Sequence, residues 1–228
     1  RRYGWKTDRS WIIHTPGVVT ALSAAVRTVT EPGDGVLIQS PVYHQFFNVI
    51  NRNGRTVVEN ELHYEDGKYS IDFADFEEKI AKNGIKQFIM CSPHNPVCRV
   101  WTPAELKEMG RICKKYNVVV FADEIYCDFF SPGYTHTPFA TVCPEMLEHL
   151  IVSTSPSKGF NIAGLQISNI FIPGEELRAK FRKTIDIVGY NECNYMGMVA
   201  CCAAYTEGEQ WLEECKAYIW ENVQYIQK

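Results

Sequence analysis

The 228-residue sequence predicts an α/β protein, a three-layer αβα sandwich in which helices cover both faces of a mostly parallel sheet. Short apolar runs of strand length alternate along the chain with segments whose apolar residues recur at helical spacing. The connections between these segments are short and rich in glycine, proline and polar residues. Strands that are joined through helices in this way pair in parallel, which predicts the layered sheet.

The predicted strands are apolar runs, and several of them end at polar residues. They cover residues 36–38, 55–60, 87–91, 118–122, 150–152 and 167–172. The run at 118–122, Val-Val-Val-Phe-Ala, is the clearest, because its β-branched residues favour a strand that is buried on both faces. Residues 64–69, by contrast, are predicted to form an exposed turn.

The first predicted helix follows a proline and a glycine, Pro16 and Gly17. Its apolar residues recur at helical spacing at Val19, Leu22, Val26 and Val29. The free backbone N–H groups at such a helix start can hold an anion such as phosphate. Most starts of this kind are only helix caps, so the sequence leaves both interpretations open.

Later helices carry clearer signals at their first residues. Asp72 is predicted to cap one helix, and Thr102-Pro103-Ala104-Glu105 is a capping box that begins another, running to about Tyr116. The pattern is helical from Glu175 onward, and residues 210–228 form an amphipathic segment. Helices therefore alternate with strands over most of the chain.

Composition excludes several classes of protein. The formal net charge of −4 gives no basic surface for nucleic acid. No apolar run approaches the roughly 20 residues of a membrane span. The nine cysteines include no Cys-x-x-Cys pair and the six histidines lack metal-ligand spacing, so we expect reduced thiols in a cytoplasmic protein and no metal site. The chain does not begin with methionine, so we expect it to start within a longer protein.

The stretch after the strand at 150–152 contains an unusual lysine. Lys158 lies among serine, proline and glycine residues, with no other charged residue between Glu148 and Glu175. A lysine in such company points to a specific need for its amine. The alternative is a loop lysine whose stem packs on apolar surface while its head reaches water.

Other polar residues also follow the ends of predicted strands. These residues are Tyr43, Asn95, Asp123, Tyr126, Ser155, Ser157 and Lys158. Because parallel strands end at one edge of a sheet, and ligands bind there, these side chains are predicted to share a site. Each has an ordinary explanation as a turn former, helix cap or half-buried aromatic, but their coincidence at one edge favours a site.

This set of groups suits pyridoxal phosphate. The aldehyde of that cofactor needs a lysine, and its pyridine nitrogen needs a carboxylate that keeps it protonated. Its phenolic oxygen needs hydrogen-bond donors, its ring an aromatic or apolar cover, and its phosphate a helix N-terminus with hydroxyl groups.

The motifs at these positions resemble those of fold-type I, class I and II aminotransferases. They are Ser-Pro-His-Asn-Pro at 92–96, Ala-Asp-Glu-Ile-Tyr at 122–126 and Ser-Pro-Ser-Lys at 155–158. Five further segments resemble, more narrowly, the MalY/PatB-type cystathionine β-lyases, and the resemblance covers nearly the whole chain. These segments are residues 15–19, 39–43, 99–102, 136–140 and 160–166.

The resemblance implies a role for each site residue. It implies that Lys158 forms the Schiff base and shuttles protons, and that Asp123 pairs with the pyridine nitrogen. Asn95 and Tyr126 are then donors to the phenolic oxygen, and Tyr43 stacks on the ring. The implied phosphate ligands are the backbone N–H groups of Gly17, Val18 and Val19 and the hydroxyl groups of Ser155 and Ser157.

Three residues depart from what the resemblance leads one to expect. The β-lyase subgroup often has histidine at the position of Tyr126, and Cys98 stands where glycine is usual. Gln166 stands where aspartate-type aminotransferases have a phosphate-binding arginine, and the β-lyase subgroup shares this glutamine. Gln166 therefore favours a lyase, whereas Tyr126 keeps a transaminase open.

The resemblance implies an enzyme that cleaves the C–S bond of cystathionine or cysteine-like amino acids by β-elimination, giving thiol, pyruvate and ammonia. An aminotransferase acting on amino acid and 2-oxo acid pairs is the first alternative, and a non-enzymatic regulatory domain is the second. Residues 1–228 are expected to be the large cofactor-binding domain of a homodimeric protein. The helix at 207–228 is expected to lead toward a small C-terminal domain.

Overall fold

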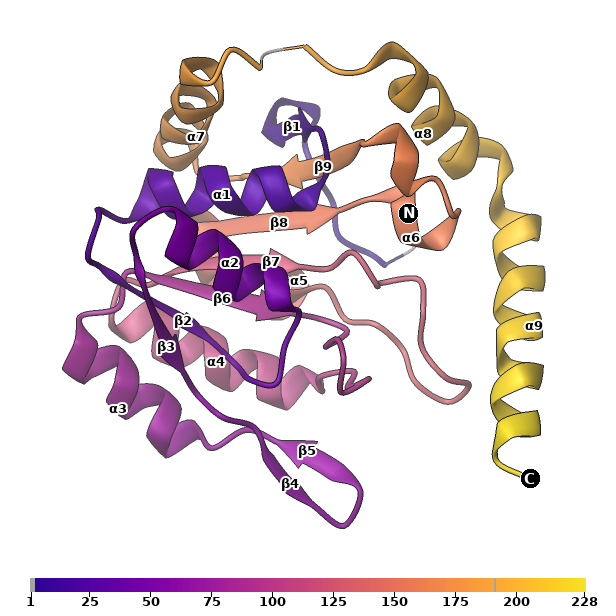
Figure 1. Cartoon of the computed structure of the whole chain (residues 1–228), viewed down its shortest axis with the longest axis horizontal. Helices are drawn as coiled ribbons and strands as arrows, with labels where there is room; N and C mark the ends of the chain where they lie inside the picture. The colour runs from indigo at the N-terminus through magenta and orange to yellow at the C-terminus, as the bar shows by residue number, and fades with distance from the viewer. Residues whose placement is uncertain (1–2, 191) are drawn as a thin grey trace.

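The computed structural model, which describes residues 3–190 and 192–228, is built on a seven-stranded sheet in the order β1-β9-β8-β7-β6-β2-β3 (Figure 1). The strands are β1 (Ile12–Thr15), β2 (Gly35–Ile38), β3 (Thr56–Glu59), β6 (Gln87–Cys91), β7 (Val119–Asp123), β8 (Leu150–Thr154) and β9 (Ser168–Phe171). Neighbouring strands from β3 to β8 pair in parallel, whereas β9 is antiparallel to both β8 and β1. The predicted, mostly parallel sheet is confirmed.

Helices cover both faces of this sheet, which completes the αβα sandwich. One face carries α1 (Val18–Val29), α2 (His44–Arg52) and α7 (Glu175–Ile187), and the other carries α3 (Phe73–Asn83), α4 (Pro103–Lys115) and the short α5 (Phe139–Val142). Shorter helical turns are η1 (Arg9–Trp11), η2 (Pro144–His149), α6 (Pro156–Gly159) and η3 (Ala163–Leu165).

Two hydrophobic cores lie on opposite faces of the sheet, because successive strand residues point to alternate sides. In β7, Phe121 packs under α1 and α2, whereas its neighbours Val120 and Ala122 pack on the α3 and α4 side. Both cores are closed by fully buried aromatic rings, such as Phe46 on one side and Phe76 on the other. The sheet is thereby held rigidly where its strands end.

The capping signals in the sequence work as predicted. Thr102 Oγ1 accepts a hydrogen bond from the Glu105 N–H at 3.2 Å, and the Glu105 carboxylate accepts one from the Thr102 N–H at 2.7 Å. Asp72 caps α3 by accepting from the Asp75 N–H at 3.0 Å. These bonds satisfy N–H groups that have no partner within the helix.

Two expectations from the sequence need correction. Residues 64–69 are not a simple turn but part of a hairpin, β4 (His63–Glu65) and β5 (Lys68–Ser70). Asp66 and Gly67 connect its strands with φ of 48° and 77°, a conformation that suits two-residue hairpin turns. The helical region after Glu175 is not continuous either, since non-helical residues separate α7 from α8 (Tyr195–Glu207).

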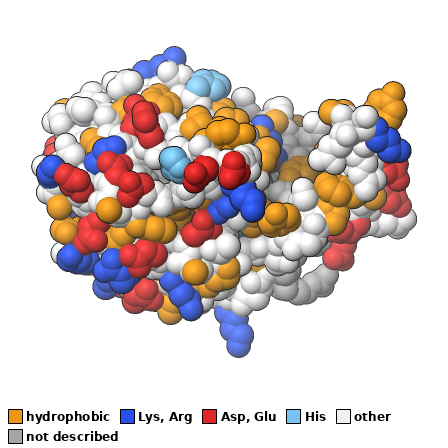
Figure 2. All heavy atoms as spheres, turned by 90° about the horizontal axis from the view of Figure 1, so that it is seen from below, with side chains coloured by type: hydrophobic (Ala, Val, Ile, Leu, Met, Phe, Trp, Pro, Cys, Tyr) orange, Lys and Arg blue, Asp and Glu red, His pale blue; other side chains and the backbone are white. Residues whose placement is uncertain are grey.

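The C-terminal helix α9 (Glu209–Ile226) lies beside the sandwich rather than on it (Figure 1). Leu212 is its buried residue, while Trp211 and Tyr218 are exposed. Among the described residues, no helix is long and apolar enough to cross a membrane. Figure 2 shows a face of the molecule on which acidic and basic side chains are interspersed rather than gathered into patches of one sign.

Candidate active site

A cavity of about 240 Å³ lies where the carboxyl ends of β6, β7 and β8 meet the N-terminus of α1. Strand β2 has β3 as its neighbour on one side and β6 on the other, and the chain runs from β2 to β3 but from β6 to β7. The connections therefore diverge between β2 and β6, beside the cavity. Ligands bind at such switch points in α/β sheets. Nine of the ten predicted site residues line the cavity: Gly17, Val18, Val19, Tyr43, Asn95, Asp123, Tyr126, Ser157 and Lys158.

Asp123 is a buried carboxylate at the end of β7, with 4% of its surface exposed. Its Oδ1 accepts hydrogen bonds from Ser153 Oγ at 3.0 Å and from the Ile125 N–H at 3.3 Å. Burial raises the pKa of Asp123 to about 6, although these two bonds and the charge of Lys158 oppose the shift. A positively charged donor in the cavity would compensate this carboxylate.

Lys158 lies on α6, directly after β8, and its side chain reaches the same cavity. Its Nζ is 5.8 Å from the centroid of the Tyr126 ring, and it forms no ion pair with any carboxylate that the structure describes. Burial raises the pKa of Tyr126, which keeps its phenol a hydrogen-bond donor at neutral pH. An amine, a neutral phenol and a carboxylate thus line one cavity that is open to solvent at Lys158.

The N-terminus of α1 offers the cavity two backbone donors. The N–H groups of Val18 and Val19 have no acceptor within residues 3–190 and 192–228, and α1 has no side-chain cap. The N–H of Gly17, which was also predicted to bind phosphate, donates to the Thr15 carbonyl at 2.8 Å. Gly17 contributes its backbone instead: a φ of 97°, which disfavours side chains with a Cβ, turns the chain into the helix.

Ser155 also differs from its predicted role, because it lies behind the cavity wall rather than on it. Its hydroxyl donates to the Ile167 carbonyl at 2.7 Å and accepts from the Ser157 N–H at 3.0 Å. Ser155 therefore caps α6 and supports Ser157, whose side chain does line the cavity. The sequence showed both serines near the strand end but not which of them faces inward.

Some cavity residues were not among the predicted site residues. They are Pro16, Leu22, Cys91, Ile125, Ala163 and Gln166. Gln166 has a left-handed backbone with φ of 48° and is exposed toward the cavity. Val19, which the helical pattern placed in the apolar stripe, is 39% exposed because it borders this space. Periodicity alone could not separate a core position from a cavity position.

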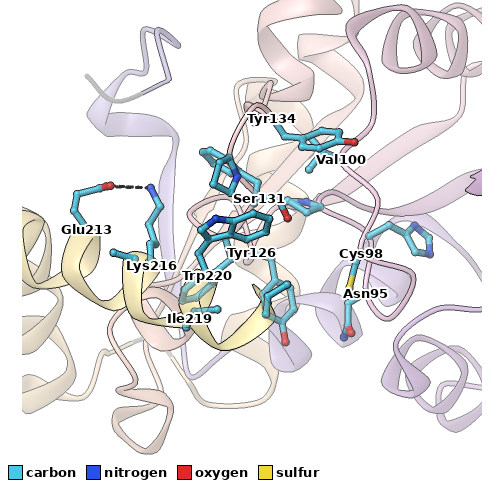
Figure 3. Close-up of a pocket in the computed structure, with 17 residues that line it drawn as sticks. Asn95, Cys98, Val100, Tyr126, Ser131, Tyr134, Glu213, Lys216, Ile219 and Trp220 are labelled. Carbon is cyan, nitrogen blue, oxygen red and sulfur yellow. Dashed lines mark hydrogen bonds and ion pairs between the residues drawn. The ribbon is translucent and has the colours of Figure 1, made fainter. Parts of the chain in front are cut away.

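A second cavity, of about 810 Å³, adjoins the first and shares Asn95 and Tyr126 with it (Figure 3). The loop at 129–134 and helix α9 form its walls, which are mostly aromatic and aliphatic. Lys216 of α9 faces this space beside Glu213, with Nζ 3.0 Å from a carboxylate oxygen and 5.2 Å from the Phe130 ring centroid. The larger cavity therefore provides an apolar space that opens beside Tyr126.

The described side chains fit pyridoxal phosphate. Asp123 is a buried carboxylate for a pyridinium nitrogen, and Lys158 an amine without an ion-pair partner for an aldehyde. The Val18 and Val19 N–H groups, with the Ser157 hydroxyl, form a phosphate cradle at a helix N-terminus. Each functional group of the cofactor has a complementary group on the cavity wall.

Residues 1–228 match the family model described as aminotransferase class I and II. The chain is 43% identical over 222 residues to cystathionine beta-lyase PatB of Bacillus subtilis, covering 97% of this chain and 57% of that protein. It is 31% identical over 220 residues to protein MalY of Escherichia coli, covering 96% of this chain and 56% of that protein. The chain thus spans a little over half the length of these curated relatives.

Solved structures agree with the sequence comparison. Cystalysin from Treponema denticola, whose crystal structure contains pyridoxal 5′-phosphate, superposes with a TM-score of 0.96 at 40% identity. The match covers 99% of this chain and 57% of that one. This chain belongs to the class I and II aminotransferase family, within which it is similar to the PatB and MalY cystathionine β-lyases.

Proposed function

We propose that the protein containing this chain binds pyridoxal phosphate and cleaves the C–S bond of cystathionine or cysteine-like amino acids by β-elimination. The observation that carries the proposal is the meeting of Asp123, Lys158 and the open N-terminus of α1 around one cavity. The similarity to PatB, MalY and cystalysin supports a carbon–sulfur substrate. The products are thiol, pyruvate and ammonia.

The residues of the chain divide the chemistry among them. When bound, pyridoxal phosphate supplies an electron sink for the substrate α-carbon. Asp123 would hold the proton on the pyridine nitrogen. Lys158 Nζ would hold the cofactor through its aldehyde and, once released by the substrate amine, would move the proton of the substrate α-carbon. Asn95 and Tyr126 donate to the phenolic oxygen, and Tyr43 covers the ring. Position in the cavity and the resemblance of the motifs support these roles.

We assign the phosphate to the Val18 and Val19 N–H groups and the Ser157 hydroxyl. Ser155 supports Ser157, and Gly17 sets the backbone turn, as their hydrogen bonds indicate. The larger cavity would take the side chain of the substrate and its leaving thiol, because it opens beside Tyr126 and has apolar walls. Its apolar walls suit the thioether part of such a substrate.

An aminotransferase with the same site is the second candidate. Transamination and elimination both begin with removal of the α-proton, so the groups around Lys158 serve either reaction. Tyr126, where the lyase subgroup often has histidine, is the residue that keeps this candidate open. Gln166 favours the lyase.

We also propose that residues 1–228 form the large domain of a longer homodimeric protein, with the helix at 207–228 leading to a small domain. The 57% coverage of PatB supports a longer chain. A cytoplasmic location is supported by the nine cysteines, none of which forms a disulfide within the described residues.

The test is product analysis of the full-length protein with cystathionine. We expect pyruvate and thiol without a keto-acid acceptor, an imine absorption band, and borohydride labelling of Lys158. Lys158→Ala should abolish the band and the activity. Lys86→Ala, which removes a surface lysine paired with Asp34 at 2.8 Å, should change neither. Labelling of a different lysine would contradict the site, and amino-group transfer without pyruvate release would contradict the reaction.

A further inference from the structure

A buried pair of side chains, Glu124 and His136, lies next to the candidate site but is not used by the proposed reaction. The His136 and Glu124 side chains are 0% and 3% exposed. Glu124 Oε2 lies 3.1 Å from His136 Nε2, and Glu124 Oε1 accepts a hydrogen bond from the Phe139 N–H at 2.9 Å. The carboxylate that directly follows Asp123 therefore reaches two points on the chain 12 and 15 residues further on.

The pairing of this carboxylate is consistent with a single histidine tautomer. Nδ1 of His136 has no hydrogen-bond partner within the described part of the chain. A neutral ring that donates Nε2–H to Glu124 leaves only a lone pair unsatisfied at Nδ1, which costs less than an unsatisfied N–H. Burying such polar groups gains little stability over a well-packed apolar pair, so their presence calls for another explanation.

The two residues stand at the two ends of the 125–135 loop. Near its start the loop carries Tyr126, which borders both cavities, and further along it carries five residues that line the larger cavity. These five are Phe129, Phe130, Ser131, Pro132 and Tyr134. The Tyr3 ring packs edge-on against His136 at 5.3 Å, and its hydroxyl donates to Asp128 Oδ1 at 2.6 Å. The contact between Glu124 and His136 thus joins the two ends of the loop, and the Tyr3 ring packs against His136.

The backbone of Glu124 links its contact with His136 to strand β7, which carries Asp123. Its N–H donates to the Ser153 carbonyl at 2.9 Å, extending the pairing of β7 with β8, and its carbonyl accepts from the Cys127 N–H at 3.0 Å. Side chains alternate along β7, so Asp123 points into the cofactor cavity while Glu124 points to the opposite side. A shift of Glu124 would therefore move Tyr126.

We propose that Glu124 and His136 are positioning residues that close the base of the 125–135 loop, and thereby hold Tyr126 beside Lys158 and shape the wall of the larger cavity. The proposal rests on the proposed function in that this loop faces substrate. Glu124 and His136, which are buried polar side chains, thus have a specific role in holding this loop.

The first experiment measures hydrogen exchange in the cofactor-free full-length protein, which needs neither cofactor nor substrate. Glu124→Ala and His136→Ala should speed amide exchange over residues 125–138 by about tenfold or more, because the loop then opens locally. Glu124→Gln should have a smaller effect, since its amide oxygen still accepts from the Phe139 N–H. Ile80→Ala, in the buried core on α3, is the control for general loss of stability.

The second experiment separates positioning from packing in the holoenzyme. Glu124→Ala and His136→Ala should raise KM for cystathionine and the cofactor dissociation constant about fivefold or more, and the double variant should be no worse than either single one. The Ile80→Ala control should leave both constants unchanged. If the alanine variants do not fold, Glu124→Gln and His136→Asn take their place.

Two outcomes would overturn the proposal. One is loop exchange that rises no more than in Ile80→Ala at an equal loss of melting temperature. The other is a loosened loop with unchanged KM and cofactor affinity. Failure of the proposed reaction would give a different result. Loop exchange would still respond to the variants, but the wild-type protein would make no pyruvate from cystathionine.

Discussion

At the scale of single residues, Asp123 is one of two buried groups that set how the stability of the cofactor-free protein depends on pH. Burial raises its pKa from 3.8 to about 6, so the folded state binds more protons than the unfolded state between these values. Stability from this group therefore falls as pH rises from about 4 to 6, and the loss persists above that range. A bound pyridinium would reverse the loss, because it compensates the buried charge.

We expect Asp123→Asn to make the cofactor-free protein more stable than the wild type at pH 7, by roughly 2–3 kcal/mol. The asparagine keeps an oxygen for the Ser153 and Ile125 donors but has no charge to bury. Urea denaturation at pH 7 and pH 4 measures the difference, which should disappear at pH 4. Equal stability at pH 7 would contradict the burial argument. In the holoenzyme the same variant should lose most of its turnover.

His94 should give the opposite dependence of stability on pH. Burial lowers the pKa of His94 from 6.5 to about 4, although its Nε2 lies 3.1 Å from the Pro41 carbonyl, a contact that opposes the shift. On acidification the unfolded state therefore takes up the proton before the folded state does. Stability from this group is present above pH 6.5 and is lost as pH falls toward 4, by roughly 3 kcal/mol. Its neighbour Asn95 shares this loop, so acid should also weaken cofactor binding.

The measurement for His94 compares the wild type with His94→Gln by denaturation at pH 7 and pH 4.5. We expect the variant to be less stable at pH 7, where a well-packed ring is lost, but to lose less on acidification. A wild type and variant that weaken equally between the two pH values would show that another group titrates. Lys86→Ala serves as a surface control, because its ion pair with Asp34 is exposed.

Residue types and strand ends were enough to predict most of the residues that line the cavity but not the orientation of each group. Lys158, Asp123 and Asn95 reach the cavity because the carboxyl ends of parallel strands meet at one edge. The N–H of Gly17 donates to the Thr15 carbonyl, and no residue pattern in the sequence reveals this hydrogen bond. Glu124 and His136 were missed because their contact spans a connection without regular periodicity.

At the scale of elements, α1 contributes its N-terminus to the site through the backbone of Gly17. Gly17→Ala should weaken phosphate-group binding about tenfold, because φ of 97° strains a residue with a Cβ and the turn would shift the Val18 and Val19 N–H groups. Gly84→Ala is the control for a positive-φ glycine outside the site. Gly84 also has a positive φ, 55°, and open space around its missing Cβ, but it ends α3 away from the cavity.

The measurement is the dissociation constant of inorganic phosphate and of pyridoxal phosphate for both variants in the full-length protein. Gly17→Ala should lose more stability than Gly84→Ala, because φ of 97° with ψ of 159° suits glycine alone whereas Gly84 has an ordinary left-handed conformation, and only Gly17→Ala should lose affinity. Equal affinities in the two variants would show that the N-terminus of α1 does not hold the phosphate.

Elements were predictable where local signals are strong. The capping box fixes the start of α4 and the Asp72 cap that of α3, and both are local signals that act within one turn. The direction of β9 was not predictable, because an apolar run has the same pattern in a parallel and an antiparallel strand. The hairpin of β4 and β5 was missed because three-residue strands with exposed side chains leave no apolar alternation.

At the scale of the whole molecule, helices α8 and α9 carry apolar side chains that the described residues do not cover. The exposed residues there are Tyr195, Met196, Val199, Tyr205, Trp211, Tyr218, Ile219, Tyr225 and Ile226. A protein that leaves so many large apolar groups in water tends to associate. Relatives such as PatB have further chain that this sequence does not match, since 57% of PatB is covered.

We therefore expect the 228-residue chain, produced alone, to self-associate, to bind pyridoxal phosphate weakly and to show negligible lyase activity. Its sandwich should still fold, because both cores are made within the chain. Tyr218→Glu and Ile226→Glu should reduce self-association in sedimentation experiments, whereas Gln224→Glu on the same helix, which adds equal charge without removing apolar surface, should have a smaller effect. A monomeric chain whose turnover matches that of the full-length protein would show that residues 1–228 carry the complete site. Weak turnover that recovers in the full-length protein would instead show that substrate is oriented by residues outside them, an effect that can amount to several kcal/mol of activation free energy.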